Sequence, residues 1–464
     1  MFWFFQSGIT DDMSNSLLQK RSRGALPMHK LALPLIGEQF FRILVSSVDT
    51  FMLSSYSEPA VAGVGMMGQY VFFLQILFNV ICIGSTIILA QYLGAQKSED
   101  ELNHVAKGGF TMTMISAFVL MLIVLIGTKP LLSCYTLEEE VRESAYQYFI
   151  IFGGIGAPFT AFNMFQTGLL RTYGYTKETF IVTIVSNLVN VAGNAVAIYG
   201  FPGIPATGTA GVAAASVLSM IAGNILMTIF IRRKSDIQFR IFKSPKVPAT
   251  VNKKILSIGV PTAGESLSYN VAQIVIMAMI SSLGTFAMNA QVYTNTIVRF
   301  VFSIAVAMGS AVQIKVGYYV GEGKKDTAYK NVFKYSLVAT LSSVILILIV
   351  NLIKAPIIGI FTSQAEIAEL TSKLLIFSIY IEFGRSLNLI YVGALKGAGD
   401  VKFPVFYGIF SMWGIMVLLS WFLGIQLHWG IIGCWLGIGT DETTRGIVML
   451  FRWKRKRWQT KSIV

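Results

Sequence analysis

Charged residues lie inside a segment that is otherwise apolar enough to cross a membrane. Residues 31–53 match the length of a membrane-spanning helix, yet they include Glu38, Arg42 and Asp49. Steps of four and seven residues bring these side chains to one face of a helix. A charge at mid-bilayer costs about 2.5–3.5 kcal/mol on insertion scales, so this face is expected to meet a bundle interior or a water-filled cavity.

Asp49 is the member of this face whose chemistry suits ion coupling. A carboxylate inside a membrane binds a sodium ion or an organic cation in its ionised form, whereas a proton neutralises it. Competition between these ligands would let the movement of one drive the movement of the other. The alternative is a structural hydrogen bond between Asp49 and polar groups of neighbouring helices.

Further charged residues recur at helical spacing in the second half of the chain. Glu382 and Arg385 are three residues apart. Asp441 and Glu442 precede Arg445 by four and three residues. These spacings permit ion pairs on one helix face. We interpret them as a network that fixes helix packing, and the alternative is a polar wall that receives substrate or a proton.

The composition is that of a membrane protein. Of the 464 residues, 54% are hydrophobic and only 13% are charged, whereas soluble domains carry about 25% charged residues. The net charge of +14 is spread over short segments between apolar runs, which argues against a nucleic-acid partner. Cysteines and histidines are scattered singly, and no catalytic or nucleotide-binding motif is present, so neither an enzyme nor an ATP-driven pump is expected.

The apolar runs predict an all-α integral membrane protein with twelve transmembrane helices in two six-helix lobes. The helices are expected near residues 31–53, 60–92, 106–127, 141–169, 179–199, 209–231, 255–283, 286–319, 330–353, 366–394, 403–426 and 430–451. A loop is expected around Pro130. The remaining predictions are an N-terminal tail at 1–30, lobes at 31–231 and 255–451, a linker at 232–254 and a basic C-terminal tail at 452–464.

The distribution of basic residues predicts the orientation. If the N-terminus is cytoplasmic, the segments on the outer side hold only four of the 37 Lys and Arg residues. They are Lys129, Arg142, Lys354 and Lys373. Because cytoplasmic loops carry the excess of Lys and Arg, both tails and the linker are expected in the cytoplasm of a multi-pass cell-membrane protein.

The chain contains an internal repeat. LALPLIGEQ resembles SIGVPTAGES, so that Glu38 and Glu265 occupy equivalent positions in the two halves. YLGAQK at 92–97 and YVGEGK at 319–324 are separated by the same interval as these two acids. A repeat of six helices keeps both halves in one orientation, as in transporters that rock two bundles about a central site. Glu38, with Arg42 four residues on, and Glu265 are therefore candidates for a gate, for coupling or for packing near the cytoplasmic side.

Several motifs together resemble the MATE (multidrug and toxic compound extrusion) family. They are SSVDTFMLSSYSEPAVAGVG at 46–65, the two loop segments above, and GLLRTYGYTK at 168–177 with GALKGAGDVK at 393–402, in which Arg171 matches Lys396. The resemblance covers about residues 28–450, and GESLSYN, IEFGRSLN and DETTRG resemble a bacterial branch. It implies a V-shaped, two-lobed antiporter that exports bulky, often cationic or amphipathic compounds in exchange for sodium ions or protons.

The resemblance also implies a cation site in the first lobe. Asp49 matches the family's aspartate on helix 1. Asn190 and Asn194 match an asparagine and an aspartate on helix 5. The second acid is thus an amide, which favours a proton over sodium as the coupling ion, and no metal beyond a sodium ion at Asp49 is expected. Arg385 stands where some members carry an acid, so the resemblance implies no cation site of that kind in the second lobe.

We therefore expect a monomeric, cofactor-free, cation-coupled antiporter that exports small drug-like or toxic organic compounds and contacts membrane lipids. The alternative function is a flippase for lipid-linked saccharides or other lipids, because such relatives share the two-lobe plan and tend to have cationic cavities. Arg42, Arg299 and Arg385 would supply such a cavity, and Arg299 has no obvious local partner. A channel is disfavoured because the sequence shows no filter loop.

Overall fold

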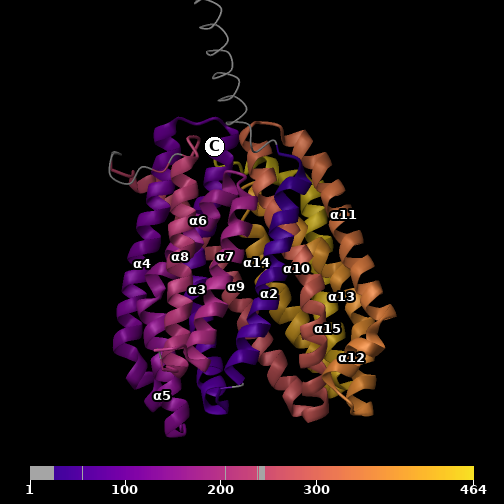
Figure 1. Ribbon diagram of the computed structural model, residues 1–464. Coiled ribbons are helices and arrows are strands. Elements are labelled where there is room, and N and C mark those ends of the chain that lie inside the picture. Colours follow the sequence, from indigo (N-terminus) through magenta and orange to yellow (C-terminus); the bar gives the residue numbers. More distant parts are fainter. Residues whose placement is uncertain (1–25, 55, 204, 238, 240–245) are drawn as a thin grey trace, which may run out of the picture. The chain divides into compact units, whose positions relative to one another are not determined.

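The computed structural model describes residues 26–54, 56–203, 205–237, 239 and 246–464, without the side chains at 46, 47 and 49–51. The elements that these residues form are helices, so the described chain has an all-helical fold (Figure 1). The chain divides into two compact units, residues 1–260 and 261–464. The boundary lies inside α9 (Ala249–Ser282), so this helix begins in the first unit and ends in the second.

Within its described residues, the first unit contains six helical spans ahead of α9. They are α2 (Met28–Ser54), α3 (Glu58–Gly94), α4 (Glu99–Ser133), α5 (Glu139–Tyr148) with the π-helix η2 (Phe149–Ile155) and α6 (Ala157–Thr172), α7 (Thr176–Tyr199) and α8 (Gly208–Arg233). The fourth span bends by 49° between η2 and α6. Pro158 lies in the first turn of α6, a position that tolerates proline because its N–H would have no helical partner.

The second unit repeats this plan with α9 as its first span. The others are α10 (Thr285–Gly321), α11 (Lys325–Leu352) with the short α12 (Lys354–Phe361), α13 (Ala365–Gly397), α14 (Lys402–Ser411) with the π-helices η3 (Met412–Val417) and η4 (Ser420–Gln426), and α15 (Gly430–Lys454), followed by the 3₁₀-helix η5 (Arg457–Thr460). The prediction of twelve helices in two groups of six is confirmed for the described chain.

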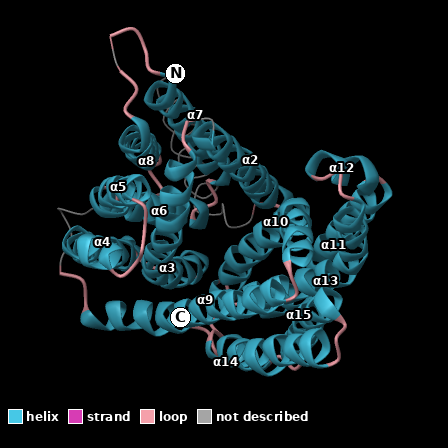
Figure 2. Cartoon of the chain, turned by 90° about the horizontal axis from the view of Figure 1, so that it is seen from below, coloured by secondary structure: helices cyan, strands magenta, loops and turns pink. Residues whose placement is uncertain are grey.

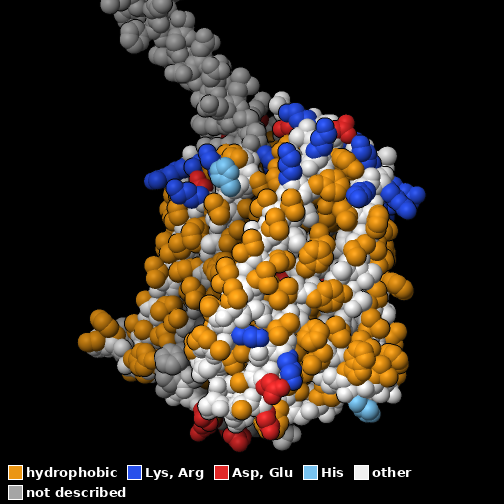
Figure 3. All heavy atoms as spheres, turned by 90° about the vertical axis from the view of Figure 1, so that its right-hand side faces the viewer, with side chains coloured by type: hydrophobic (Ala, Val, Ile, Leu, Met, Phe, Trp, Pro, Cys, Tyr) orange, Lys and Arg blue, Asp and Glu red, His pale blue; other side chains and the backbone are white. Residues whose placement is uncertain are grey.

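The surface of the long helices suits a bilayer. Eight described helices are long and apolar enough to cross a membrane, and nine spans result if the bent pair counts as one. Figure 3 shows a broad hydrophobic band below the Lys and Arg side chains that gather at the upper end of this face. On α11, exposed apolar side chains recur every three or four residues, which is the spacing of one helix face. They are Leu337, Leu341, Ile345, Leu348 and Leu352.

The prediction of a loop around Pro130 is wrong, because α4 continues to Ser133 with Pro130 inside it. The last carbonyls of a helix have no N–H partner within the helix and need other donors. Here the Ser133 hydroxyl donates to the Pro130 carbonyl at 2.7 Å, and the Cys134 thiol donates to it at 3.4 Å. The side chains that follow the proline thus satisfy the carbonyl at the helix end.

The C-terminal basic segment packs against the second unit and is not a free tail over its described length. The indole rings of Trp453 and Trp458 are both buried and stack with centroids 4.0 Å apart. The Lys325 ammonium donates to the Gln459 carbonyl at 2.7 Å. The two tryptophans supply the apolar surface that keeps this otherwise highly charged segment in place.

Candidate ion-coupling and substrate sites

Helices α2 and α7 lie side by side in the first unit with a constant register (Figure 2). The Thr183 hydroxyl on α7 donates to Glu38 Oε1 on α2 at 3.1 Å, across 145 residues of sequence. Leu53 of α2 and Ile198 of α7, which are separated by the same interval, share one hydrophobic cluster. Equal intervals at both ends mean that the two helices run parallel, because both rise about 1.5 Å per residue.

This register places Asp49 at the level of Asn194, which follows it by the same interval. The side chain of Asp49 lies outside the described residues. Asn190 and Asn194 are both buried on α7, and the Asn194 amide donates to Asn190 Oδ1 at 3.4 Å. The Asn190 amide donates to Ser216 Oγ on α8 at 3.2 Å. The backbone thus brings the three residues of the predicted cation site to neighbouring levels, and Ser216 is a polar neighbour that the sequence did not reveal.

Glu38 forms the centre of a buried ion pair in the first unit. Its side chain is 0% exposed, and its Oε2 lies 2.6 Å from Nη2 of Arg171 at the end of α6. Arg42, whose side chain is half-exposed, contacts Oε1 at 2.9 Å. The hydroxyls of Thr179 and Thr183 also donate to the carboxylate, at 3.5 and 3.1 Å. The predicted contact with Arg42 is present, but Arg171 is the partner that sequence spacing missed.

The second unit holds the equivalent ion pair. Glu265 on α9 lies 2.6 Å from the Lys396 ammonium at the end of α13. Glu265 is the repeat counterpart of Glu38, and Lys396 is that of Arg171. The same helix-to-helix contact is therefore built twice. The repeat contained the signal for both pairs, because an acid and a base recur at matching positions in both halves.

Neutralising both members of the Glu265–Lys396 pair is expected to cost less stability than the sum of the single changes. In a cycle of Glu265→Gln, Lys396→Met and the double variant, we expect a coupling of about 0.5–3 kcal/mol, because the two groups are in direct contact and nearly buried. Unfolding of the purified protein by SDS titration, followed by tryptophan fluorescence, measures it. Additive single effects would contradict a coupled pair.

A second charge network joins α13 to α15. Arg385 lies 2.5 Å from Glu382 and 3.4 Å from Glu442. Arg445 lies 2.6 Å from Asp441 and 3.5 Å from Glu442. The network therefore has two guanidinium groups that share the central Glu442 carboxylate. The ion pairs allowed by the sequence spacing are present, and Glu442 also links the two helices, which spacing within one helix does not predict.

Polar neighbours and small residues complete this network. The Asn388 amide donates to Glu442 Oε2 at 2.8 Å, and the Ser411 hydroxyl donates to Asp441 Oδ1 at 2.5 Å. Gly384 lets α13 approach α15, because a Cβ atom there would lie 2.6 Å from the Thr443 backbone nitrogen. Such close packing keeps the charged groups within hydrogen-bonding distance and away from lipid.

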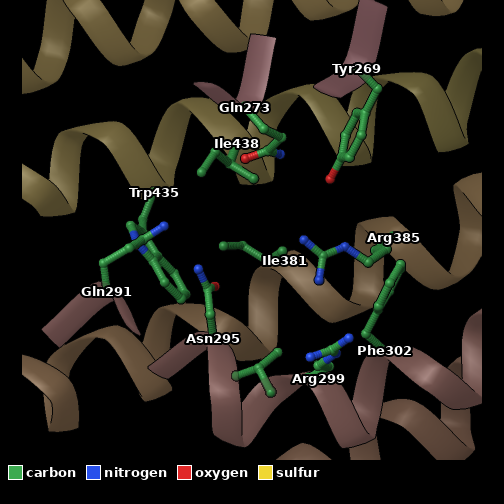
Figure 4. A pocket seen from close by; sticks show the side chains of 11 residues that line it. Tyr269, Gln273, Gln291, Asn295, Arg299, Phe302, Ile381, Arg385, Trp435 and Ile438 are labelled. Carbon is green, nitrogen blue, oxygen red and sulfur yellow. The ribbon is translucent and has the colours of Figure 1, made fainter. Parts of the chain in front are cut away.

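A pocket of about 240 Å³ lies beside this network, entirely within the second unit (Figure 4). Side chains from α9, α10, α13 and α15 surround it. They are Tyr269, Gln273, Gln291, Asn295, Val298, Arg299, Phe302, Ile381, Arg385, Trp435 and Ile438. Of the three arginines that the sequence offered for a cationic cavity, Arg299 and Arg385 line this pocket, whereas Arg42 lies in the first unit. Mixed aromatic and polar walls of this kind are typical of small-molecule sites.

The described residues contain no group of three or more His, Cys, Asp or Glu side chains arranged to hold a metal ion. The donors placed near Asp49 by the register are amide and hydroxyl groups. Such oxygens can complement a single carboxylate around a hard cation. The residues around Asp49 are thus chemically compatible with a proton or with a sodium ion as the transported partner.

Comparison with known proteins places the chain in a family. The MatE family model matches residues 34–196 and 261–422, which fall in the two halves of the repeat. A transporter of Bacillus subtilis, YisQ, described as uncharacterized, is 32% identical over 97% of this chain and 98% of its own length. A protein of Thermotoga maritima named probable multidrug resistance protein NorM is 27% identical over 94% of this chain and 93% of its own.

Solved structures share the fold. A structure titled as MATE in the straight conformation superposes with a TM-score of 0.86, at 18% identity, over 95% of this chain and 96% of that one. An outward-facing multidrug resistance MATE family transporter superposes with a TM-score of 0.84, at 19% identity, over 93% and 95%. With the family model covering most of both halves, the chain is a multi-pass membrane transporter that belongs to the MATE family.

Proposed function

We propose that this transporter is a proton-coupled antiporter that exports drug-like or toxic organic compounds by alternating access of its two helical units. The observation that carries the proposal is the register of α2 and α7, which sets Asp49 at the level of the buried Asn194. Several relatives, including the Thermotoga maritima protein, are named as probable multidrug resistance proteins. Small organic substrates, a monomeric state and contact with membrane lipids are part of the same proposal.

The charge of the α2–α7 site favours a proton as the coupling ion. Asp49 supplies one carboxylate, and the neighbouring Asn190, Asn194 and Ser216 are neutral. One proton neutralises one carboxylate completely, whereas a sodium ion would keep its charge and would need several oxygen ligands. Protonation would therefore release a cationic substrate or permit a conformational change without leaving a net charge inside the membrane.

Expression of the protein in an efflux-deficient bacterium is expected to lower the accumulation of cationic fluorescent dyes. Collapse of the proton gradient should abolish the effect, because the gradient supplies the free energy for export. Dye fluorescence in cells with and without an uncoupler measures both points. Unchanged accumulation across a broad dye panel would contradict drug export.

A flippase for lipid-linked saccharides is the second candidate function. The pocket of the second unit favours it because two arginines line that pocket, and such cavities suit phosphate-bearing lipids. A changed cell-surface polysaccharide on deletion or expression, without any change in dye accumulation, would support this function over drug export.

We further propose that both termini and the linker between the units are cytoplasmic, as the Lys and Arg distribution predicts. In a cysteine-free background, single cysteines at Ser57, Glu138 or Thr207 should react with an impermeant maleimide in intact cells. A cysteine at Lys246 should react only after the cells are opened. The reverse pattern would contradict the proposed orientation.

A further inference from the structure

We propose that the pocket of the second unit binds an organic anion, specifically a small aromatic or apolar group that carries a carboxylate or a similar acid. The proposal deepens the proposed function, on which it rests for the direction of transport, by assigning a substrate class to this pocket. It departs from the cationic compounds that the family resemblance implies.

Among the described residues, the charged side chains that line this pocket are both arginines. Arg299 and Arg385 are among its lining side chains, and no Asp or Glu is. The nearby acids lie behind the wall, with side-chain exposures of 0% for Glu382 and 5% for Glu442. A ligand in the pocket therefore meets guanidinium groups, while the compensating carboxylates are already engaged with Arg385 and with Arg445 behind it.

Arg299 makes no hydrogen bond, ion pair or ring contact with any other described residue, and it is exposed. It lies about 21 Å along α10 from the start of that helix at Thr285, and α10 continues beyond it to Gly321. An arginine far from both ends of a membrane-spanning helix is costly unless a partner satisfies it. A bound anion would be that partner.

Arg385 supports the same proposal from a neighbouring part of the wall. Its Nη1 and Nε atoms contact Glu382 and Glu442, and its guanidinium carbon lies 4.9 Å from the centre of the Phe302 ring. A guanidinium has five N–H donors, so these contacts leave donors for a ligand. Figure 4 shows Arg299 and Arg385 on neighbouring parts of the pocket, with Phe302 beside Arg385.

The rest of the pocket suits a flat apolar group with polar edges. The Trp435 indole is held by a hydrogen bond of 2.5 Å to Gln291 Oε1, so its ring is fixed in the wall. Ile381 and Ile438 add apolar surface, and Gln273 adds an amide. A volume of about 240 Å³ accommodates a molecule of one or two fused rings.

This chemistry is specific to the second unit. At the interval that relates Glu38 to Glu265, the counterpart of Arg299 is Phe72. At the interval that relates Arg171 to Lys396, the counterpart of Arg385 is Thr160. The ion pairs of Glu38 and Glu265 recur in both halves, as packing elements of a shared scaffold do. The two pocket arginines do not recur, as expected for groups that recognise a ligand in one half only.

Three probes of nearly identical shape test the proposal with the full-length protein in detergent or nanodiscs. They are 2-naphthoate, 2-naphthylmethanol and 2-naphthylmethylammonium, titrated by calorimetry at pH 7. We expect naphthoate to bind at least about tenfold more tightly than the alcohol, and the ammonium to bind most weakly. Arg299→Gln should weaken naphthoate binding about 10- to 100-fold, because a hydrogen-bonded charge is lost, and should leave the alcohol unaffected.

Two further variants separate a local charge effect from net charge and from folding. Arg299→Lys keeps the charge and should retain most of the affinity. Arg455→Gln removes an exposed charge that no described residue pairs with, outside the pocket, and should bind naphthoate as the wild type does. Unchanged thermal unfolding of Arg299→Gln shows that its loss of binding is not a loss of folding.

Equal affinity for the three probes, tightest binding of the ammonium, or undiminished naphthoate binding by Arg299→Gln would overturn the anion pocket. These outcomes are distinct from a failure of the proposed function. If export of the cationic dyes is absent while Arg299-dependent naphthoate binding is present, export of cationic compounds fails and the pocket stands. If export is normal in the wild type and naphthoate does not bind, the pocket proposal alone fails.

Discussion

Asp49→Asn is expected to abolish gradient-driven export, down to the level of liposomes without the protein, while the protein still inserts in the membrane. The change keeps the size of the side chain and removes the negative charge at the level of Asn194. Without an ionisable carboxylate, the site no longer alternates between a charged and a neutral state as protons bind and leave. Dye export by proteoliposomes under an imposed pH gradient measures the effect.

Asn194→Asp is the complementary variant, because it adds an acid on α7 at the level of Asp49. A second carboxylate attracts a sodium ion more strongly, so this variant should gain dependence on an imposed sodium gradient. Normal export by Asp49→Asn would refute the assignment of this site. Wild-type export that follows a sodium gradient and ignores a pH gradient would refute proton coupling while leaving the site in place.

Glu442→Ala is expected to destabilise the second unit by about 3–5 kcal/mol, the typical cost of removing one partner of a buried ion pair. Glu442 is 5% exposed and contacts both Arg385 and Arg445. Without Glu442, Arg385 and Arg445 each lose one of their two carboxylate partners. The change also leaves the Asn388 amide without its 2.8 Å acceptor.

Glu369→Ala on α13 is the matched control for Glu442→Ala. Glu369 also pairs with a basic residue, Lys373, at 2.6 Å, but the two side chains are 68% and 52% exposed. An exposed pair of this kind contributes less than about 1 kcal/mol. SDS-titrated unfolding of both variants compares the two costs. Equal losses of stability would show that burial does not govern the energy of the Glu442 network.

The Glu442 variant also bears on the anion pocket. Removing a carboxylate from behind Arg385 makes the surroundings of the pocket more positive. A folded Glu442→Gln protein should therefore bind 2-naphthoate at least as tightly as the wild type, whereas Arg299→Gln should bind it more weakly. The two variants separate the acids that stabilise the helices from the arginine that faces the pocket.

The sequence alone determined the helical architecture and the internal repeat. Membrane-length apolar runs predict helices because a bilayer leaves no other way to satisfy backbone polar groups within one segment. The similar segments around Glu38 and Glu265 predicted equivalent positions, and the structure places both acids in ion pairs with bases at the ends of α6 and α13. Helix ends were less predictable, as Pro130 shows, because side chains of the final turn can satisfy its carbonyls.

Tertiary structure alone decided how the charges of α13 and α15 meet and which charges remain for a ligand. Helical spacing identifies partners three or four residues apart, so it found Arg42 for Glu38 and Asp441 for Arg445. Partners on different helices depend on register and on close packing at small residues such as Gly384, which no periodicity within one segment specifies. For that reason the sequence did not pair Glu442 with Arg385. It named Arg299 for a cationic cavity, but it did not show that the described lining of that cavity contains no acid.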